Sequence, residues 1–191
     1  MGINIMGDAY RHAIWLAIFV LFLIAERLLE LKSANRNFHR LIESGGQEFG
    51  ASHYAAIIAM HTAFFFSLII EFVLRGYPLT PFWPAALAIF LIAQALRIWT
   101  RLAMGERWTT RIVVIPGEQL ITNGPFRFVS HPIYVAVALE LFSAPLLFGL
   151  YTTCILFSIL NGIVLLFFRI PSERAALEWS QTGMTATKLT P

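Results

Sequence analysis

Two short polar motifs, each beside an apolar run, contain residue types that can bind charged groups. They are Ser130-His131-Pro132-Ile133-Tyr134 and Arg169-Ile-Pro-Ser-Glu173. Because proline suits the first position of a helix, Pro132 predicts His131 as the helix N-cap and Tyr134 in the first turn. The free N–H groups of such a turn, with the positive end of the helix dipole, favour a carboxylate or phosphate ligand.

The chain around these motifs predicts the elements that would hold them. Asn123-Gly124-Pro125 is a turn signal that allows the backbone to approach a ligand closely. The segment Arg111–Ile115 is expected to be short and extended. A short helix is expected over residues 169–179, with Glu173 in its first turn.

Each candidate residue also has a purely structural interpretation. His131 can simply cap a helix, Tyr134 can anchor an interface, and Glu173 can complement a helix dipole. Gathered on one side of a membrane beside a Gly-Pro turn, they predict a site. A metal centre is not predicted, because His53 and His61, although able to share a helical face, have no acidic or cysteine partner at ligand spacing.

Composition indicates a membrane protein. Of the 191 residues, 58% are hydrophobic and only 13% are charged, with a mean hydropathy of +0.69, whereas soluble domains are roughly half apolar and a quarter charged. The pI near 9.4 comes from basic residues that flank apolar runs, so it indicates membrane orientation and not nucleic-acid binding. The single cysteine, Cys154, offers no disulfide and no metal pair.

The apolar runs predict an all-α integral membrane protein with one domain over residues 1–191. A membrane span needs roughly 20 largely apolar residues. Five spans are expected, at Ala13–Leu31, Tyr54–Leu74, Pro84–Met104, Ile133–Phe148 and Thr152–Phe168. The last two are short and separated by three residues, so they are either two spans or one helical hairpin that reaches the far interface.

Charge predicts the orientation of these spans. Of the fourteen Lys and Arg residues, only Arg11 and Arg75 lie at the N-terminus or in the second loop. The positive-inside rule therefore places the N-terminus outside and the C-terminus in the cytosol. Both polar motifs are then expected at the cytosolic face.

Several polar side chains lie at membrane depth and need an explanation, because an unpaired charge in lipid is costly. They are His61, Glu71, Gln94, Arg97, Glu140 and Asn161. Glu71 is expected to be interfacial. Glu140 is expected either to pair with an interior amide or arginine or to face the substrate. Arg97 and Arg101, one turn apart, either cover apolar surface with their stems or meet an anionic cofactor or headgroup.

The motifs resemble those of the isoprenylcysteine carboxyl methyltransferase family of integral membrane enzymes. The resemblance rests on Gly124-Pro125-Phe126 and on the two motifs above. It is closest to a bacterial branch that O-methylates alkylpyrones and alkylresorcinols, and it extends nearly end to end. It departs at Ser130, where the family has arginine, and at Arg174, where a second glutamate is expected.

The resemblance implies a five-span fold that binds S-adenosylmethionine at the cytosolic face, in a multi-pass protein of a bacterial inner membrane. The residues implied in cofactor binding are Gly124, Pro125, His131, Pro132, Tyr134 and Glu173. A lipid-like acceptor would enter between spans, either an alkylpyrone or alkylresorcinol or a prenylcysteine-type carboxylate. His131 is the candidate base for a phenolic acceptor, and Arg111 or Arg127 would steady its negative charge.

Two other functions remain open. One is an NADPH-dependent membrane reductase of sterols or enones, whose C-terminal helices share a similar His-Pro-x-Tyr motif. The other is a non-catalytic lipid-binding membrane protein, which the two departures from the family pattern favour. Preference for one cofactor over the other separates the methyltransferase from the reductase.

Overall fold

The computed structural model describes residues 5–76 and 80–187, with the backbone alone for 5–9 and 182–187. The elements are α-helices with one short two-stranded sheet, so the predicted all-α membrane fold is confirmed. The helices are α1 (Ile5–Glu43), α2 (Ala51–Leu74), α3 (Trp83–Met104), α4 (Pro132–Leu146), α5 (Tyr151–Val164) and α6 (Ile170–Thr187).

Within the described residues, three helical stretches are long and apolar enough to cross a membrane. They are Ala51–Leu74, Trp83–Arg107 and Tyr151–Gln181. Helix α4 is apolar but has only 15 residues. It is joined to α5 by the turn at Leu147–Leu150, and the choice between two spans and one hairpin stays a prediction. The chain is therefore a multi-pass membrane protein.

Helix α1 extends well beyond the expected end of the first span at Leu31. Its 39 residues reach about 58 Å at 1.5 Å per residue. The buried face begins with Leu16, Val20 and Leu23, and seven and fourteen residues after Leu23 it contains the buried polar residues Glu30 and Asn37. The apolar face of the helix thus becomes a polar one, and this second part carries α1 out of the apolar region.

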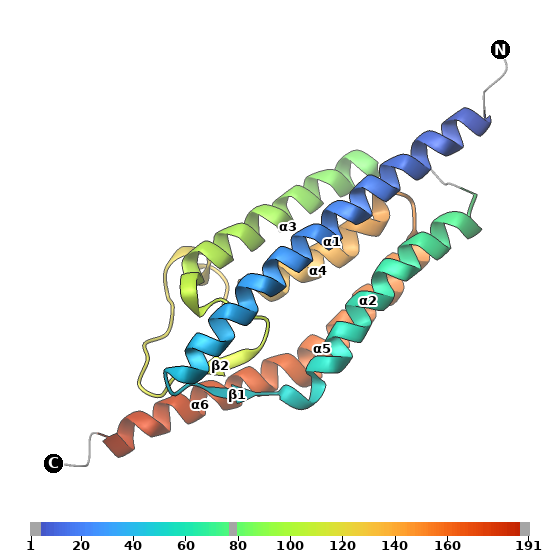
Figure 1. The fold of residues 1–191 in the computed structure, drawn as a ribbon. Coiled ribbons are helices and arrows are strands. Elements are labelled where there is room, and N and C mark those ends of the chain that lie inside the picture. The colour runs from blue at the N-terminus through green and yellow to red at the C-terminus, as the bar shows by residue number, and fades with distance from the viewer. Residues whose placement is uncertain (1–4, 77–79, 188–191) are drawn as a thin grey trace.

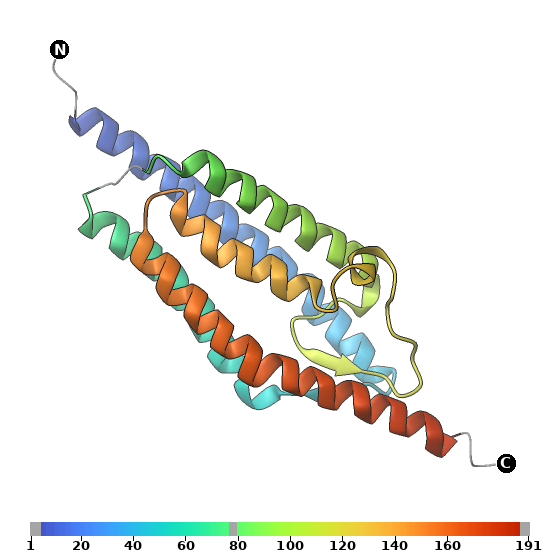
Figure 2. The same cartoon turned by 180° about the vertical axis from the view of Figure 1, so that it is seen from behind.

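The helices form two groups (Figures 1 and 2). Helices α1, α3 and α4 lie together, and α2 lies along α5. The core is rich in phenylalanine: Phe19 contacts Phe90 and Phe148 in the first group, and Phe64 contacts Phe157 in the second, with ring centroids 5.2–5.4 Å apart. Phe72 of α2 lies 6.2 Å from Phe148, which follows α4, so that this contact joins the two groups. These large rings hold the apolar ends of the two groups together.

The water-facing elements gather at one end of the molecule, here called the platform end (Figure 1). It comprises β1 (Gln47–Phe49), β2 (Ile112–Val114), the short 3-10 helices η1 (Gly105–Arg107) and η2 (Gly124–Arg127), and α6. Strands β1 and β2 pair antiparallel, with Glu48 opposite Val113. The extended segment predicted around Ile112 is therefore confirmed, and its partner is a strand that follows α1.

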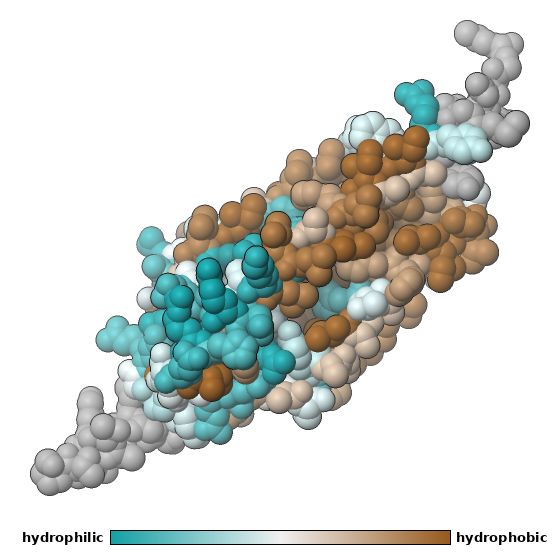
Figure 3. Space-filling view, in the orientation of Figure 1, coloured by the Kyte–Doolittle hydropathy of each residue, from teal (hydrophilic) through white to brown (hydrophobic). Residues whose placement is uncertain are grey.

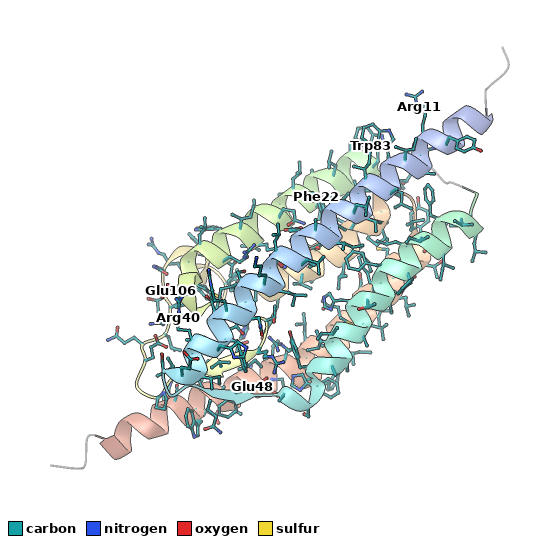
Figure 4. All side chains as sticks on the ribbon, viewed as in Figure 1. Arg11, Phe22, Arg40, Glu48, Trp83 and Glu106 are labelled. Atoms are coloured by element: carbon teal, nitrogen blue, oxygen red, sulfur yellow. The ribbon has the colours of Figure 1, made fainter. Side chains whose placement is uncertain are left out.

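Surface hydropathy follows this division (Figure 3). Hydrophilic side chains cover the platform end, and hydrophobic ones cover most of the helical region on this face. Arg40, Glu48 and Glu106 lie at the platform end, whereas Arg11 and Trp83 lie toward the other end (Figure 4). Arg40 and Glu106 form an ion pair between α1 and η1.

The sequence suggested that α6 begins as a separate helix near Pro171, but it does not. A π-helical segment, η3 (Leu165–Arg169), joins α5 to α6, so that Tyr151–Gln181 is one continuous helical run. Pro171 has no N–H to bond to the carbonyl four residues earlier, and a widened turn just before it accommodates that loss. Glu173 does lie in the first turn of α6, as predicted.

The buried charges on α1, α3 and α4 form one network, here called the interior ion network: Glu26, Arg27, Glu30, Arg97, Arg101 and Glu140. Glu140 accepts hydrogen bonds from Arg27 at 2.6 and 2.8 Å and also pairs with Arg97. The expected pairing of Glu140 with an arginine is confirmed. Gln94, an alternative partner, has an amide without a hydrogen bond within the described chain.

The structure gives three other membrane-depth residues contacts that the sequence did not predict. Arg97 and Arg101 do not merely cover apolar surface, because both bond to Glu30, at 3.1 and 3.2 Å. Glu71 has more than an interfacial position: it is 8% exposed and accepts the backbone N–H groups of Thr152 and Thr153. It thereby satisfies donors that the first turn of α5 leaves unpaired.

Candidate functional site

The first candidate motif forms the start of α4, as predicted. His131 is the N-cap and Pro132 is the first helical residue. Pro132 is buried, has no N–H, and packs the helix start against its surroundings. The N–H groups of Tyr134 and Val135 both bond to the carbonyl of His131, at 3.1 and 3.3 Å. The turn therefore offers fewer free donors to an anion than the sequence suggested.

The structure brings the two candidate motifs together. Nδ1 of His131 lies 3.3 Å from Oε2 of Glu173, and the two side chains are 27% and 30% exposed. Both atoms are themselves buried, and neither makes a hydrogen bond of good geometry in the described part of the protein. Buried polar atoms are normally satisfied, so this pair has unused capacity to bind a ligand.

Tyr134 and Arg169 complete the contact between α4 and the start of α6. The ring of Tyr134 stacks on that of His131, with centroids 5.3 Å apart and planes inclined by 16°. The guanidinium of Arg169 lies over the Tyr134 ring at 5.7 Å, within cation–π range. Arg169 also donates to the carbonyl of Thr110, at 3.3 Å. The widened turn of η3 ends at Arg169, which links it directly to the site.

Sequence reasoning gave no role to the residues on the other side of this cluster. The hydroxyls of Tyr54 and Thr110 lie 2.9 Å apart, and this contact joins α2 to the segment before β2. The ring of His53 lies 5.8 Å from that of Phe168, and its Nε2 is buried without a hydrogen bond in the described chain. His53 is also close enough to Arg169 to feel its charge.

A glycine brings His53 to this position. Gly50 has φ +67°, a left-handed conformation that favours glycine. A Cβ there would lie 2.4 Å from the His53 ring and 3.2 Å from Cβ of Ser172. The turn between β1 and α2 therefore packs against the start of α6. The sequence did contain a signal for this arrangement, because Gly50 directly precedes the helix that carries His53.

Gly124 and Pro125 lie against α3 instead of facing this cluster. Gly124 has φ +58°, and a Cβ there would lie 2.8 Å from Cβ of Ala103 and 3.4 Å from Nε1 of Trp99. Pro125 is fully buried. The turn is close-packed, as a Gly-Pro signal predicts, but the close neighbour is the last turn of α3.

The two arginines proposed to stabilise the negative charge of the acceptor, Arg111 and Arg127, make no hydrogen bond or ion pair with the His131–Glu173 pair. Arg111 donates to Glu48 at 2.9 Å, and its guanidinium lies 4.7 Å from the Phe38 ring and 4.5 Å from the Tyr54 ring. Its charge is thus already balanced within the platform end. Arg127 is exposed in η2.

The two departures from the family pattern are both at the surface. Ser130 precedes the N-cap and is exposed, and Arg174 follows Glu173 and is exposed. Neither side chain takes part in the His131–Glu173 contact. That contact is therefore intact in a chain that carries both departures.

The residues of the cluster fit a charged organic cofactor. It presents one carboxylate, one guanidinium, two imidazole rings and an aromatic ring, with buried nitrogen and oxygen atoms unsatisfied. Carboxylates accept from ammonium or hydroxyl groups, and aromatic rings stack on flat bases or attract cations. No group of three or more His, Cys, Asp or Glu that could hold a metal ion occurs among the described residues.

Comparison with known proteins places the chain in a family. The sequence profile of the isoprenylcysteine carboxyl methyltransferase family matches residues 86–179, which run from α3 into α6. An uncharacterized protein of Bacillus subtilis, YpbQ, is 41% identical over 86% of this chain and 96% of its own length. An uncharacterized protein of Haemophilus influenzae is 28% identical over 59% of this chain and 65% of its own length.

No solved structure gave a significant match. The family match includes the start of α4, the widened segment η3 and Glu173, the parts that build the cluster. This chain belongs to the isoprenylcysteine carboxyl methyltransferase family.

Proposed function

We propose that this protein is an S-adenosylmethionine-dependent O-methyltransferase that acts on a lipid-like acceptor at the platform end. Family membership supports methyl transfer to a membrane-associated substrate. The observation that carries the proposal is the 3.3 Å pair of His131 and Glu173, whose facing atoms are buried and lack hydrogen bonds. A ligand that supplies those bonds would be held where the two motifs meet.

In this proposal Glu173 accepts from the ammonium or a hydroxyl of the cofactor. His131 and Tyr134, already stacked, offer a flat surface beside it. When bound, S-adenosylmethionine supplies a methyl group on a sulfonium. The protein then mainly has to align acceptor and donor, which can contribute roughly 7–11 kcal/mol.

The roles first proposed for Arg111 and Arg127 pass to Arg169. Arg111 shares its charge with Glu48, and Arg127 lies on the exposed face of η2. Arg169 lies over Tyr134 and close to His53. It is therefore the better placed cation to stabilise negative charge on the acceptor.

Binding of two cofactors separates this proposal from its rivals. S-adenosylhomocysteine and NADPH are titrated into the detergent-purified protein by calorimetry, with Glu173→Gln as the test variant and Glu178→Gln, on the same helix, as the control. We expect S-adenosylhomocysteine to bind in the wild type and in the control, and about tenfold or more weaker in Glu173→Gln, because a hydrogen bond to a charged group is lost.

Other results assign the protein elsewhere. Binding of NADPH alone would make the protein a reductase. Binding of neither would favour a non-catalytic lipid-binding protein. Equal loss in both glutamate variants would show that overall charge, and not Glu173, governs binding.

We further propose that the acceptor is an alkylpyrone or an alkylresorcinol, following the branch that the sequence resembles, with a prenylcysteine-type carboxylate as the alternative. An alkylpyrone enol is acidic and needs no base, whereas a resorcinol hydroxyl benefits from one. If His131 is that base, His131→Ala lowers turnover of an alkylresorcinol by about 100-fold or more relative to an alkylpyrone. An equal decrease for both acceptors assigns His131 to cofactor binding alone.

A further inference from the structure

A cavity lies at the platform end and does not include the His131–Glu173 pair in its lining. It has a volume of about 390 Å³ and opens between the second half of α1 and the last turns of α3. Its lining includes Ser33, Arg36, Asn37, Arg101, Leu102 and Trp108, none of which is a candidate site residue.

Within the part of the chain that the structure describes, the cavity is lined by an arginine without a carboxylate partner and by two residues whose buried N–H groups are unpaired. Arg36 is exposed and has no carboxylate partner within the described ranges. Trp108 is only 6% exposed, yet its indole N–H makes no hydrogen bond in the described chain, and neither does Nε of Arg101. A buried donor without an acceptor is costly, so an acceptor from outside the protein would relieve that cost.

The surrounding contacts hold these donors in place. The carbonyl of Trp108 accepts from the buried amide of Asn37, at 2.9 Å. The guanidinium of Arg101 lies 5.9 Å from the Trp108 ring and donates to Glu30 at 3.2 Å. Glu106 also lines the cavity, but it is 79% exposed and paired with Arg40. The cavity lining therefore carries a net positive charge, which comes from Arg36.

Apolar side chains lie directly beside these donors. Ile98 and Leu102 also line the cavity and are 53% and 76% exposed on α3. Both belong to the stretch that is apolar enough to cross a membrane, and the cavity lies near its end. An anion held here would have its phosphate at the polar side of the cavity and hydrocarbon along α3.

We propose that this cavity binds the headgroup phosphate of an anionic phospholipid, with Arg36, Trp108 and Arg101 as donors and Ile98 and Leu102 against the acyl chains. Basic pockets between membrane helices recognise such headgroups. Arg101 also bonds to Glu30 of the interior ion network, so the lipid is joined to the helix contacts of α1 and α3.

Native mass spectrometry of the purified protein tests this site. Dihexanoyl phosphatidylglycerol, dihexanoyl phosphatidylcholine and inorganic phosphate are titrated separately. Arg36→Gln and Trp108→Phe are the test variants, and the second keeps an aromatic ring under Arg101. Lys32→Gln is the matched control, because Lys32 is exposed one turn earlier on α1 and does not line the cavity.

We expect phosphatidylglycerol to bind, with affinity about tenfold lower in Arg36→Gln, a smaller loss in Trp108→Phe, and no change in Lys32→Gln. Equal binding of phosphatidylcholine would overturn the proposal, as would an equal loss in Lys32→Gln. Inorganic phosphate that binds as tightly as the lipid would show a phosphate site and refute the lipid assignment.

Discussion

The interior ion network and the His131–Glu173 pair both set carboxylates beside side-chain nitrogen atoms, but the carboxylates of Glu30 and Glu140 are more completely hydrogen-bonded than that of Glu173. In the network, Glu30 and Glu140 accept hydrogen bonds at both carboxylate oxygens from Arg27, Arg97 and Arg101. In the pair, Oε2 of Glu173 has no hydrogen bond from the described residues.

Their positions explain this difference. Glu30, Glu140 and Arg97 are 3–6% exposed between helices of the apolar region, where an unpaired charge is expensive. His131 and Glu173 are more than a quarter exposed at the platform end, where water or a ligand can reach them. The network therefore holds α1, α3 and α4 together, and the pair is free to bind.

Removing one carboxylate from the network should produce the largest loss of stability. Glu140→Leu removes one of the two carboxylates that Arg27 and Arg97 share and leaves them only Glu30 in common, at a cost of about 3–5 kcal/mol in the free energy of unfolding. Unfolding in mixed micelles measures it. Glu43→Ala, at the exposed end of α1, is the control and should change little. A double variant Glu140→Leu/Arg97→Leu should recover part of the loss, because fewer charges are stranded. An unchanged stability in Glu140→Leu would show that the network is not structural.

Gly124→Ala tests whether the close contact between the Gly-Pro turn and α3 contributes to stability. Alanine at φ +58° with Cβ 2.8 Å from Cβ of Ala103 should cost about 2–4 kcal/mol in unfolding free energy. Gly76→Ala is the control, since its φ is +66° and no atom lies within 4 Å of an added Cβ. It should cost only the backbone part, about 1–2 kcal/mol. Equal losses would show that the contact with Ala103 is unimportant.

Glu71 resembles the network residues, because its carboxylate is buried and satisfied, but its hydrogen bonds come from backbone N–H groups and its ion pair with Arg75 is longer, at 3.5 Å. Glu71→Gln should lower the unfolding free energy by about 1 kcal/mol, since one acceptor and the charge–dipole attraction are lost. Arg75→Gln, which removes the weaker 3.5 Å ion pair, should cost less than that. A larger effect in Arg75→Gln would assign the stability to the ion pair.

The His131–Glu173 pair should show the smallest effect on stability. His131→Ala is expected to change the unfolding free energy by less than about 1 kcal/mol, because the two side chains are more than a quarter exposed and make no hydrogen bond of good geometry to each other. The same variant should nonetheless weaken S-adenosylhomocysteine binding measurably in calorimetry. A loss of stability as large as in Glu140→Leu would remove the distinction between the two regions.

Much of the site could be predicted from local sequence. Pro132 indicated a helix start with His131 as the N-cap, and Glu173 was expected in the first turn of α6. These are short-range effects, in which one residue constrains its own backbone. The involvement of His53, Tyr54 and Thr110 was not predicted, because they come from α2 and the segment before β2 and meet the site only through tertiary packing.

The sequence by itself determined the membrane-protein class, the start of α4 and the need for Glu140 to have a polar partner, because apolar length, proline geometry and the cost of a buried charge are local properties. Only the tertiary structure decided which arginines meet Glu140 and Glu30, that Gly124 packs on α3, and that α6 continues α5 through a widened turn. Those outcomes depend on which helix faces are brought together, and helices far apart in the chain determine that jointly.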